Sequence, residues 1–392
     1  MNNFIYHAPT KVVFGLGAEL EAGELSAQMG YKKALVHYGS ESAVKSGLLQ
    51  TVCDSLKKSG VDYFTLGGVV PNPRLSKVNE GIEAVKKEKA DFILAVGGGS
   101  VIDSAKAIAL GAANDGDVWD FYADKREPEA CLPVACVLTM SAAGSEMSES
   151  SVITNDATGE KRGFSSDLVR CVFSLMNPKL TASVPPYQTA CGCVDIMMHT
   201  LERYFTRDVP RDIIDSMAEG LLKTVMEWAP LAIEEPDNYE ARAEIMWAGS
   251  LSHNGVTGDR NYGDWSCHQL EHELSGMFDV AHGAGLAAIW GSWARYVLPS
   301  NQERFAKLAA NVFGLKNPGW SEGQKAALAI SAMENFFQSI GMPTTLSELG
   351  LDIDDETIKK LAWNCSFGGM RTIGGLKELK MEDMANIYSE AR

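Results

Sequence analysis

The first half of this chain alternates short β-rich runs with helical stretches, and this alternation constrains the fold more than any other feature. Short runs rich in apolar and β-branched residues are followed by stretches with apolar residues at helical spacing. The clearest strand-like runs cover residues 33–38 and 91–96, and the clearest helical stretches cover residues 48–58 and 101–110. Strands that alternate with helices predict a parallel sheet covered by helices.

The second half follows a different pattern, which begins after the adjacent prolines Pro185 and Pro186. Apolar residues recur there at helical spacing, with almost no β-branched alternation. Because adjacent prolines disfavour a continued helix or a central strand, the boundary is expected near residue 184. The sequence therefore predicts an α/β domain over residues 1–183 and an all-helical domain over residues 184–392.

Length, charge and cysteine content narrow the class of protein. The 392 residues suffice for two domains, and 45% hydrophobic residues supply a core for each. A net charge of −16 and the lack of Lys or Arg runs argue against a nucleic-acid partner. No run approaches the roughly eighteen apolar residues of a membrane span, and the first residues do not resemble a signal peptide. We expect a cytoplasmic globular protein without a membrane partner, whose eight cysteines are reduced.

A glycine cluster at Gly97, Gly98 and Gly99, followed by Ser100, lies between a strand-like run and a helical stretch. Consecutive glycines leave backbone amides uncovered at a helix N-terminus, where a phosphate or pyrophosphate can bind. A tight turn between strand and helix needs one glycine and seldom three. The cluster therefore favours a phosphate site over a purely structural turn.

The segment 38–45 bears on the choice between NAD and NADP. In a dinucleotide-binding domain, an acidic side chain just after a strand such as the expected strand 33–38 accepts hydrogen bonds from the ribose 2′-hydroxyl of NAD and repels a 2′-phosphate. Small hydroxyl residues and Lys45 favour NADP(H), whereas Glu41 argues for NAD(H) if it points inward. We expect NADP(H) in preference to NAD(H), with contacts from Gly39, Ser40, Ser42 and Lys45.

Acidic and histidine side chains cluster in two segments of the second half. Asp195 and His199 are spaced by four in a stretch expected to be helical, which places both on one face. His268 and His272 repeat this spacing, and His282 follows soon after. A lone histidine on an apolar face is more often a core residue than a ligand, but this clustering favours a metal. A carboxylate with imidazoles suits zinc or ferrous iron, and spacing alone leaves open which histidines bind.

Other residues near these segments have structural interpretations. Glu202 is a candidate acceptor for an imidazole N–H, with an exposed salt bridge as the alternative. Neighbouring cysteines at one or two positions from a ligand point to another side of a helix, so thiolate coordination is disfavoured. His7, His37 and His253 lie apart from the cluster and are expected to be structural.

The segment His268-Gln-Leu-Glu271-His272 also matches the H-x-x-E-H pattern of inverted zincin metallopeptidases. In those enzymes the two histidines bind zinc and the glutamate activates water. This interpretation explains neither the Asp195 and His199 pair nor the glycine cluster. It also requires a further acidic ligand downstream that does not stand out, so we disfavour it.

Several motifs in order along the chain resemble the iron-containing, group III alcohol dehydrogenases, and within them the bacterial butanol dehydrogenase and aldehyde reductase branch. The likeness covers nearly the whole chain, and the segments that carry it are 9–15, 71–74, 97–103, 139–147, 194–202 and 267–285. The resemblance implies a dehydroquinate synthase-like fold, with an N-terminal α/β dinucleotide-binding domain and a C-terminal helical domain. It also implies a homodimer that transfers hydride between NAD(P)(H) and a primary alcohol or aldehyde, such as butanol or butanal.

The resemblance also assigns residues. The ligands of Fe2+ or Zn2+ carry over to Asp195, His199, His268 and His282. His272 matches a histidine near the nicotinamide that does not bind metal, which makes it the candidate catalytic residue. Positions expected to contact the cofactor are Asn72, Gly98, Gly99, Ser100, Asp103, Thr139 and Lys161.

Two residues depart from the family pattern, and two alternative functions stay open. Ala143 replaces the usual threonine, and Glu41 replaces a residue that is typically glycine in the NADP-using branch. The alternatives are a glycerol dehydrogenase or another dehydroquinate synthase-like enzyme, and an inactive relative that binds metal or nucleotide.

Overall fold

The computed structural model describes residues 4–39, 41–207, 211–258 and 260–392. It divides into two units, and Ser40 lies outside the described residues. The α/β unit comprises His7–Val184 with Asp237–Met246, and the helical unit comprises Met1–Tyr6, Pro185–Pro236 and Trp247–Arg392.

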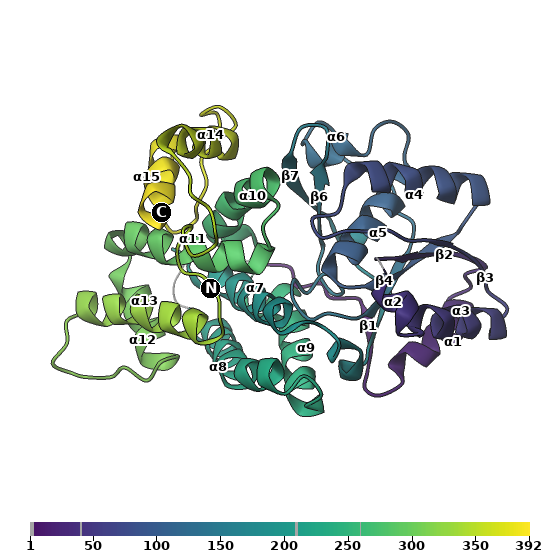
Figure 1. The fold of residues 1–392 in the computed structure, drawn as a ribbon, viewed down its shortest axis with the longest axis horizontal. Helices are drawn as coiled ribbons and strands as arrows, with labels where there is room; N and C mark the ends of the chain where they lie inside the picture. Colours follow the sequence, from purple (N-terminus) through teal and green to yellow (C-terminus); the bar gives the residue numbers. More distant parts are fainter. Residues whose placement is uncertain (1–3, 40, 208–210, 259) are drawn as a thin grey trace. The chain divides into compact units, whose positions relative to one another are not determined.

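Six strands form one parallel sheet in the α/β unit, in the order β1-β8-β5-β4-β2-β3. Figure 1 labels β1, β2, β3 and β4 of this sheet. Every residue of the near-central strand β4 is buried, as expected for a parallel strand covered on both faces. A separate antiparallel hairpin joins β6 to β7. The bounds are β1 (Lys11–Phe14), β2 (Lys33–Tyr38), β3 (Asp62–Leu66), β4 (Phe92–Gly97), β5 (Val134–Leu138), β6 (Ser150–Asn155), β7 (Glu160–Ser165) and β8 (Phe173–Met176).

Helices pack on both faces of this sheet. Because side chains alternate along a strand, Phe92 and Leu94 of β4 join one core cluster, while Ile93 and Ala95 join the other. The first cluster includes residues of α1 and α3, and the second includes residues of α4 and α5. The helical segments of the unit are η1 (Ala18–Glu21), α1 (Ala22–Gln28), α2 (Ser42–Lys45), α3 (Leu48–Lys58), α4 (Leu75–Glu88), α5 (Gly99–Ala113), α6 (Trp119–Tyr122), η2 (Asp167–Val169) and η3 (Pro178–Thr181).

The described part of the helical unit is built from helices around α7, in which all residues over 189–204 are buried. Pro186 occupies the first turn of α7, where a proline is tolerated because its missing N–H has no partner within the helix. The helical segments are α7 (Pro186–Tyr204), α8 (Asp212–Glu234), α9 (Tyr239–His253), η4 (Arg260–Tyr262), α10 (Ser266–Phe278), α11 (His282–Val297), η5 (Leu298–Ser300), α12 (Gln302–Asn311), α13 (Glu322–Ser339), α14 (Asp355–Cys365) and α15 (Met381–Ala391). The division between the two units falls inside α9.

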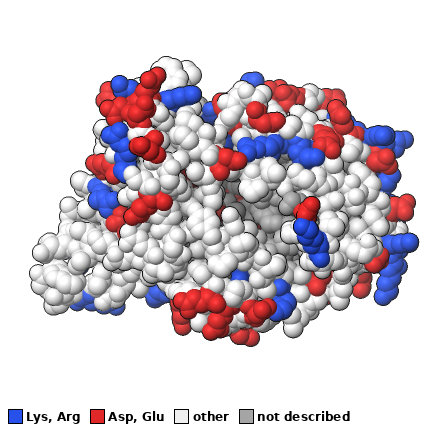
Figure 2. All heavy atoms as spheres, in the orientation of Figure 1, with Lys and Arg blue, Asp and Glu red and all other residues white. Residues whose placement is uncertain are grey.

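The observed architecture confirms the predicted class, a parallel α/β unit and a helical unit. The segments 33–38 and 48–58 agree with β2 and α3, while the helix expected over 101–110 extends to 99–113. Among the described residues, no helix is both long and apolar enough to cross a membrane. Figure 2 shows acidic and basic side chains interspersed over the visible face of each unit, which fits the lack of basic runs in the sequence.

His37 on β2 is fully buried in the core of the α/β unit. Its Nδ1 lies 2.8 Å from the Leu66 carbonyl oxygen, which can only accept, so Nδ1 carries the hydrogen. Its Nε2 lies 2.9 Å from Ser104 Oγ on α5 and accepts from that hydroxyl. Burial lowers the pKa of His37 to about 4, so the imidazole is neutral in the folded protein. The sequence placed His37 among the structural histidines, and these contacts agree.

We predict that His37 makes the folded state acid-sensitive. The unfolded chain binds a proton at His37 near pH 6.5, whereas the folded chain does so only near pH 4. Stability linked to this group is therefore complete above pH 6.5 and falls by about 3 kcal/mol as the pH drops towards 4. Urea unfolding between pH 7.5 and 4.5 should show a shallower pH dependence in His37→Gln than in the wild type.

The matched control is His7→Gln, because the side chain of His7 is 52% exposed. That variant should keep the wild-type pH dependence. Equal pH dependence in the His37→Gln variant and the wild type would contradict the prediction.

Candidate functional site

Helix α7 carries a carboxylate and an imidazole on one face. Asp195 and His199 are one turn apart, and each is 4% exposed. Asp195 Oδ1 lies 3.2 Å from His199 Nδ1, but the geometry of the pair does not make a hydrogen bond. The expected helical pair is therefore present, with both polar groups directed towards one point inside the helical unit.

The turn between α10 and α11 brings two more histidines to this point. Asp279 adopts a left-handed conformation with φ 53° and ends α10, and His282 is the first residue of α11. The Nε2 atoms of His268 and His282 lie 3.7 and 3.8 Å from Asp195 Oδ1. Potential ligand atoms of Asp195, His268 and His282 all lie within 4.8 Å of one another. His199 adjoins this set through Asp195, and its ring centroid is 4.5 Å from that of His268.

Three polar atoms in this cluster are buried without hydrogen bonds. Among the described residues, Asp195 Oδ1, His199 Nδ1 and His268 Nε2 have no hydrogen-bond partner. Buried polar atoms without partners are costly, and such atoms normally find a ligand, an ion or water. A carboxylate oxygen that faces several imidazole nitrogens fits a divalent transition metal. The residues present are therefore suited to hold such a cation.

Glu202 orients one of these imidazoles. Its Oε1 lies 3.1 Å from His268 Nδ1 and 3.0 Å from the His268 backbone nitrogen. Because a carboxylate oxygen can only accept, Nδ1 carries a hydrogen, which leaves Nε2 as the nitrogen that can bind a metal once it has lost its proton. Glu202 is thus the imidazole acceptor that the sequence offered as a candidate.

Glu271 on α10 is the corresponding partner of His282. Its Oε2 accepts from His282 Nδ1, and its Oε1 accepts from the Ser275 hydroxyl. Glu271 is fully buried, and a Cβ at Gly285 would lie 2.9 Å from its Cγ, so the glycine leaves room for this side chain. In the sequence, Glu271 stood out only as the glutamate of the disfavoured H-x-x-E-H pattern. The signals for its role were Ser275 one turn later and the glycines after His282.

Charge and burial set the protonation of the ligand candidates. Burial lowers the pKa of His199 well below its usual value, with nearby cationic groups adding to the effect. Burial acts to lower the pKa of His268 as well. The carboxylates of Asp195 and Glu202 outweigh this effect and raise the pKa to about 9 when no metal is bound. Metal binding at His268 therefore requires the release of a proton.

His272 and His253 also lie beside the cluster. His272 forms a close set with Glu271 and His282, and its ring centroid is 5.9 Å from that of His282. His253, which the sequence placed apart from the cluster, stacks on His199 with ring centroids 4.0 Å apart. The end of α9 brings it there from 54 residues along the chain, and no local pattern indicated this contact.

Trp265 packs against the rings of His199, His253 and His268. It precedes α10 in a left-handed conformation with φ 60°, which is unusual for a bulky residue. Its ring lies edge-on to His268, with centroids 5.5 Å apart. The Arg203 guanidinium lies 4.7 Å from the Trp265 ring and donates to the His199 carbonyl oxygen at 2.9 Å. These contacts surround His199 with aromatic rings.

The glycine cluster of the α/β unit forms the turn between β4 and α5. Gly98 caps α5 in an extended conformation without a side-chain cap, so amides of the first turn are available to an anion. Thr139 follows β5 directly and its backbone nitrogen donates to Gly97 O at 3.1 Å. A Cβ at Gly98 would lie 3.2 Å from Met140 Cβ, and one at Gly99 would lie 3.4 Å from Ala143 Cβ.

The β6–β7 hairpin carries Lys161 and pairs with the backbone just after Asn72. Asn72 is buried with φ 53°, and Arg74 two residues later pairs with Thr154 of β6. Thr154 lies opposite Lys161 in the hairpin register. Asn72 thus combines burial with a sparsely populated backbone conformation, a combination that recurs at ligand sites.

The remaining candidate cofactor residues have contacts within the protein. Ser42 begins α2, Gly39 accepts from the Gly68 nitrogen at 2.9 Å, and Lys45 forms an ion pair with Glu41. Asp103 uses both carboxylate oxygens inside the unit, on Ser145 Oγ at 2.5 Å and on the Val152 nitrogen at 3.0 Å.

Two family models match nearly the whole chain. Residues 9–178 match the iron-containing alcohol dehydrogenase model, and residues 189–392 match the C-terminal model of the Fe-containing alcohol dehydrogenase family. The chain belongs to the iron-containing alcohol dehydrogenase family. The resemblance drawn from the motifs is therefore confirmed. This enzyme is an oxidoreductase of the alcohol dehydrogenase class, in a family that uses NAD(P) and a metal.

Curated relatives and solved structures agree with this family. The chain is 41% identical to the probable NADH-dependent butanol dehydrogenase 1 of Bacillus subtilis, over 99% of both chains. It is 36% identical to the NADPH-dependent aldehyde reductase YqhD of Escherichia coli, over 100% of both chains. The crystal structure of NADH-dependent butanol dehydrogenase A from Thermotoga maritima superposes with a TM-score of 0.94 at 40% identity, covering 100% of this chain and 99% of that one.

We predict that Glu271→Gln weakens metal binding about 10- to 100-fold, as is typical when a partner of a ligating histidine is changed. Glutamine keeps the size of the side chain and one acceptor for His282 Nδ1, but removes the negative charge. Metal content after dialysis against graded chelator concentrations measures the loss. Glu273→Gln, on the same helix, is the control and should retain metal as the wild type does. Equal retention by both variants would refute the role of Glu271.

Proposed function

We propose that this enzyme transfers hydride between NAD(P)(H) and a primary alcohol or aldehyde, such as butanol or butanal, at a metal held by Asp195, His199, His268 and His282. The observation that carries the proposal is the convergence of these four side chains in the helical unit, with three buried atoms that lack hydrogen bonds among the described residues. Relatives at 35–41% identity named as butanol dehydrogenases support this substrate class.

Each ligand candidate has a defined contribution. One carboxylate with three imidazoles suits Fe2+ or Zn2+. When bound, such a cation stabilises negative charge on the oxygen of the alcohol or aldehyde. Glu202 and Glu271 keep the Nε2 atoms of His268 and His282 directed towards Asp195.

We assign proton exchange to His272. It lies beside Glu271 and His282 and is 9% exposed, so it adjoins the cluster and retains some contact with solvent. An imidazole in water titrates near neutral pH, which suits proton transfer to and from a substrate oxygen.

We propose that residues 1–183 bind the dinucleotide and residues 184–392 bind the metal. The first turn of α5 would hold the pyrophosphate on its free amides, with Gly98, Gly99 and Ser100 at its start. Other proposed contacts are Gly39, Ser42, Lys45, Asn72, Thr139 and Lys161, together with Ser40 outside the described residues.

The choice of cofactor depends on the pair Glu41 and Lys45. The expected preference for NADP(H) rested partly on Lys45, but its ammonium is paired with the Glu41 carboxylate. A carboxylate here repels a 2′-phosphate and can accept from a 2′-hydroxyl. Several relatives are named as NADH-dependent, while the aldehyde reductase YqhD is named as NADPH-dependent. We therefore propose that Glu41 shifts the balance towards NAD(H), against the sequence expectation, which stays untested.

Assembly and location follow the family expectation. We propose a homodimer that acts on small alcohols and aldehydes in the cytoplasm. Light scattering of the purified protein measures the mass of the assembly directly, and a mass of one chain would refute the dimer.

Alanine variants of two histidines separate the metal site from proton transfer. His282→Ala should abolish stoichiometric metal, because it removes a ligand that lies 3.8 Å from Asp195 Oδ1. His272→Ala should retain metal, turn over more slowly and show an altered pH dependence of kcat. Metal analysis and NAD(P)H oxidation at 340 nm with butanal measure both effects.

The opposite pattern, metal loss in His272→Ala and retention in His282→Ala, would overturn the ligand assignment. An unchanged pH dependence in His272→Ala would remove its proton-transfer role. Absence of butanal reduction by the metal-loaded wild type with either cofactor would refute the proposed reaction.

We predict that Glu41→Gly improves kcat/KM for NADPH relative to NADH by about tenfold. The change removes a repulsive carboxylate and frees the Lys45 ammonium, and for exposed groups the two effects together are about 1.4 kcal/mol, which corresponds to tenfold. The double variant Glu41→Gly, Lys45→Ala should lose much of this gain. An unchanged NADPH to NADH ratio in both variants would show that this pair lies away from the 2′ position.

A further inference from the structure

Lys106 on α5 is a charged residue in the interior of the α/β unit. Its side chain is fully buried, and its ammonium makes hydrogen bonds with a single segment of the chain. The Nζ atom donates to the carbonyl oxygens of Ser145, Ser148 and Ser150, at 2.7, 3.0 and 2.8 Å. Ser148 Oγ lies 3.3 Å from the same atom. The segment 145–150 therefore curls around an ammonium group, with its carbonyl oxygens turned inward.

Asp103, one turn earlier on the same helix face, holds the two ends of this segment. Its Oδ1 accepts from Ser145 Oγ at 2.5 Å, and its Oδ2 accepts from the Val152 nitrogen at 3.0 Å. Its backbone carbonyl accepts from Ser151 Oγ at 2.9 Å. Asp103 and Lys106 together tie the segment to α5 through side chains of opposite charge.

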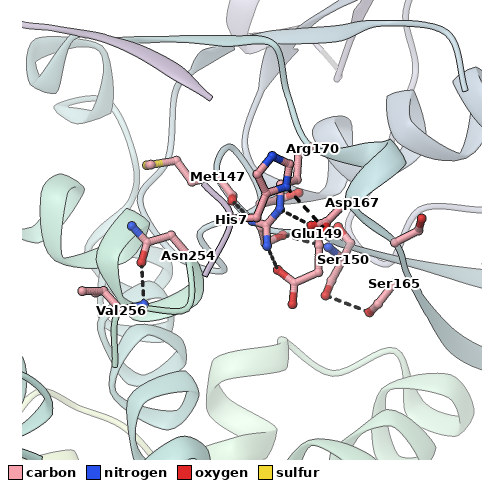
Figure 3. A network of polar contacts seen from close by, with 12 residues as sticks. His7, Met147, Glu149, Ser150, Ser165, Asp167, Arg170, Asn254 and Val256 are labelled. Atoms are coloured by element: carbon pink, nitrogen blue, oxygen red, sulfur yellow. Dashed lines mark hydrogen bonds and ion pairs between the residues drawn. The ribbon is translucent and has the colours of Figure 1, made fainter. Parts of the chain in front are cut away.

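A third anchor of the segment is Arg170. The Arg170 guanidinium donates to the Met147 carbonyl oxygen at 2.7 Å and pairs with Glu149 at 2.9 Å (Figure 3). Arg170 also pairs with Asp167, so its own position is fixed. Ser150 and Ser165 close the hairpin beside it, with hydroxyl oxygens 3.0 Å apart. The segment is thus held by charged side chains from two parts of the chain, Asp103 and Lys106 on α5 and Arg170 before β8.

The residues just before this segment adjoin the glycine cluster. A Cβ atom at Gly98 would lie 3.2 Å from the Cβ of Met140, and one at Gly99 would lie 3.4 Å from the Cβ of Ala143. The stretch 139–150 therefore forms a wall beside the first turn of α5, and its far end is anchored further along that helix. A buried ammonium is costly unless its partners are well placed, so its retention here indicates a positional role.

We propose that Lys106 is a positioning residue for the dinucleotide. Its ammonium donates hydrogen bonds to the carbonyl oxygens of the segment 145–150, and the Asp103 carboxylate binds Ser145 and Val152 at the two ends of this segment. This arrangement keeps Met140 and Ala143 at a set distance from the amides of the glycine cluster. The role of Asp103 is then to hold this wall, in place of the direct cofactor contact expected from the motif. The inference rests on the proposed dinucleotide site of the α/β unit.

The test uses the full metal-loaded enzyme and its Lys106→Ala variant. Titration with NADH and NADPH, followed by protein fluorescence, should show cofactor binding about 10- to 100-fold weaker in the variant, because a small misplacement of a binding wall is costly. Hydrogen exchange should accelerate in peptides that cover 145–152. Lys87→Ala, an exposed lysine on α4, is the control and should match the wild type in both measurements.

Chemical rescue distinguishes the ammonium from general loss of packing. Ethylammonium should restore cofactor binding in Lys106→Ala because it supplies N–H donors, whereas tetramethylammonium at the same concentration should not. Equal rescue by both cations, or wild-type cofactor binding in the variant, would overturn the proposal. If Lys106→Ala does not fold, Asp103→Asn provides the same measurements, since an amide cannot accept through both of its terminal atoms.

Failure of the proposed function has a different signature. A wild-type enzyme that binds neither NADH nor NADPH refutes the dinucleotide site itself. In that case the hydrogen-exchange contrast between Lys106→Ala and Lys87→Ala still decides whether the ammonium holds the segment. Unchanged exchange over 145–152 in a folded Lys106→Ala variant would refute that hold, whatever the cofactor result.

Discussion

A buried carboxylate oxygen of Asp195 faces imidazoles from three helices, and the helical unit is organised around this arrangement. The oxygen and two of the facing nitrogens make no hydrogen bonds among the described residues, so the protein holds them apart at 3.2 to 3.8 Å. Desolvation without partners opposes folding unless a cation joins the groups. Full burial of α7 over 189–204 provides the rigid support that such a site requires.

Support for the imidazoles comes from residues outside the proposed ligand set. Glu202 and Glu271 each accept from one Nδ1 atom, which fixes the tautomer and directs the opposite nitrogen inward. His253 stacks on His199, and Trp265 lies edge-on to His199 and His268. A buried negative charge thus stands behind two of the three imidazoles, and aromatic rings flank the third.

The α/β unit also uses a buried charge to fix its neighbours, but there the charge is positive. There a buried ammonium, Lys106, attracts backbone carbonyl oxygens and shapes a loop beside the glycine cluster. Asp103 and Arg170 add charged hydrogen bonds at the edges of that loop. In both units, buried charged groups fix the position of the groups they bond to, because charged hydrogen bonds are strong and directional away from water.

The sequence by itself determined the features that depend on neighbours along the chain. Short apolar runs identified the strands and helical spacing identified the helices, the adjacent prolines Pro185 and Pro186 predicted a change of class near residue 184, and the i, i+4 spacing paired Asp195 with His199. Motif order also identified the family. Only the tertiary structure brought His268 and His282 to Asp195, placed Glu271 behind His282, stacked His253 on His199 and turned Asp103 towards Ser145 and Val152. These contacts join residues that are far apart in sequence or on different helix faces, and the packing of whole elements decides which side chains meet.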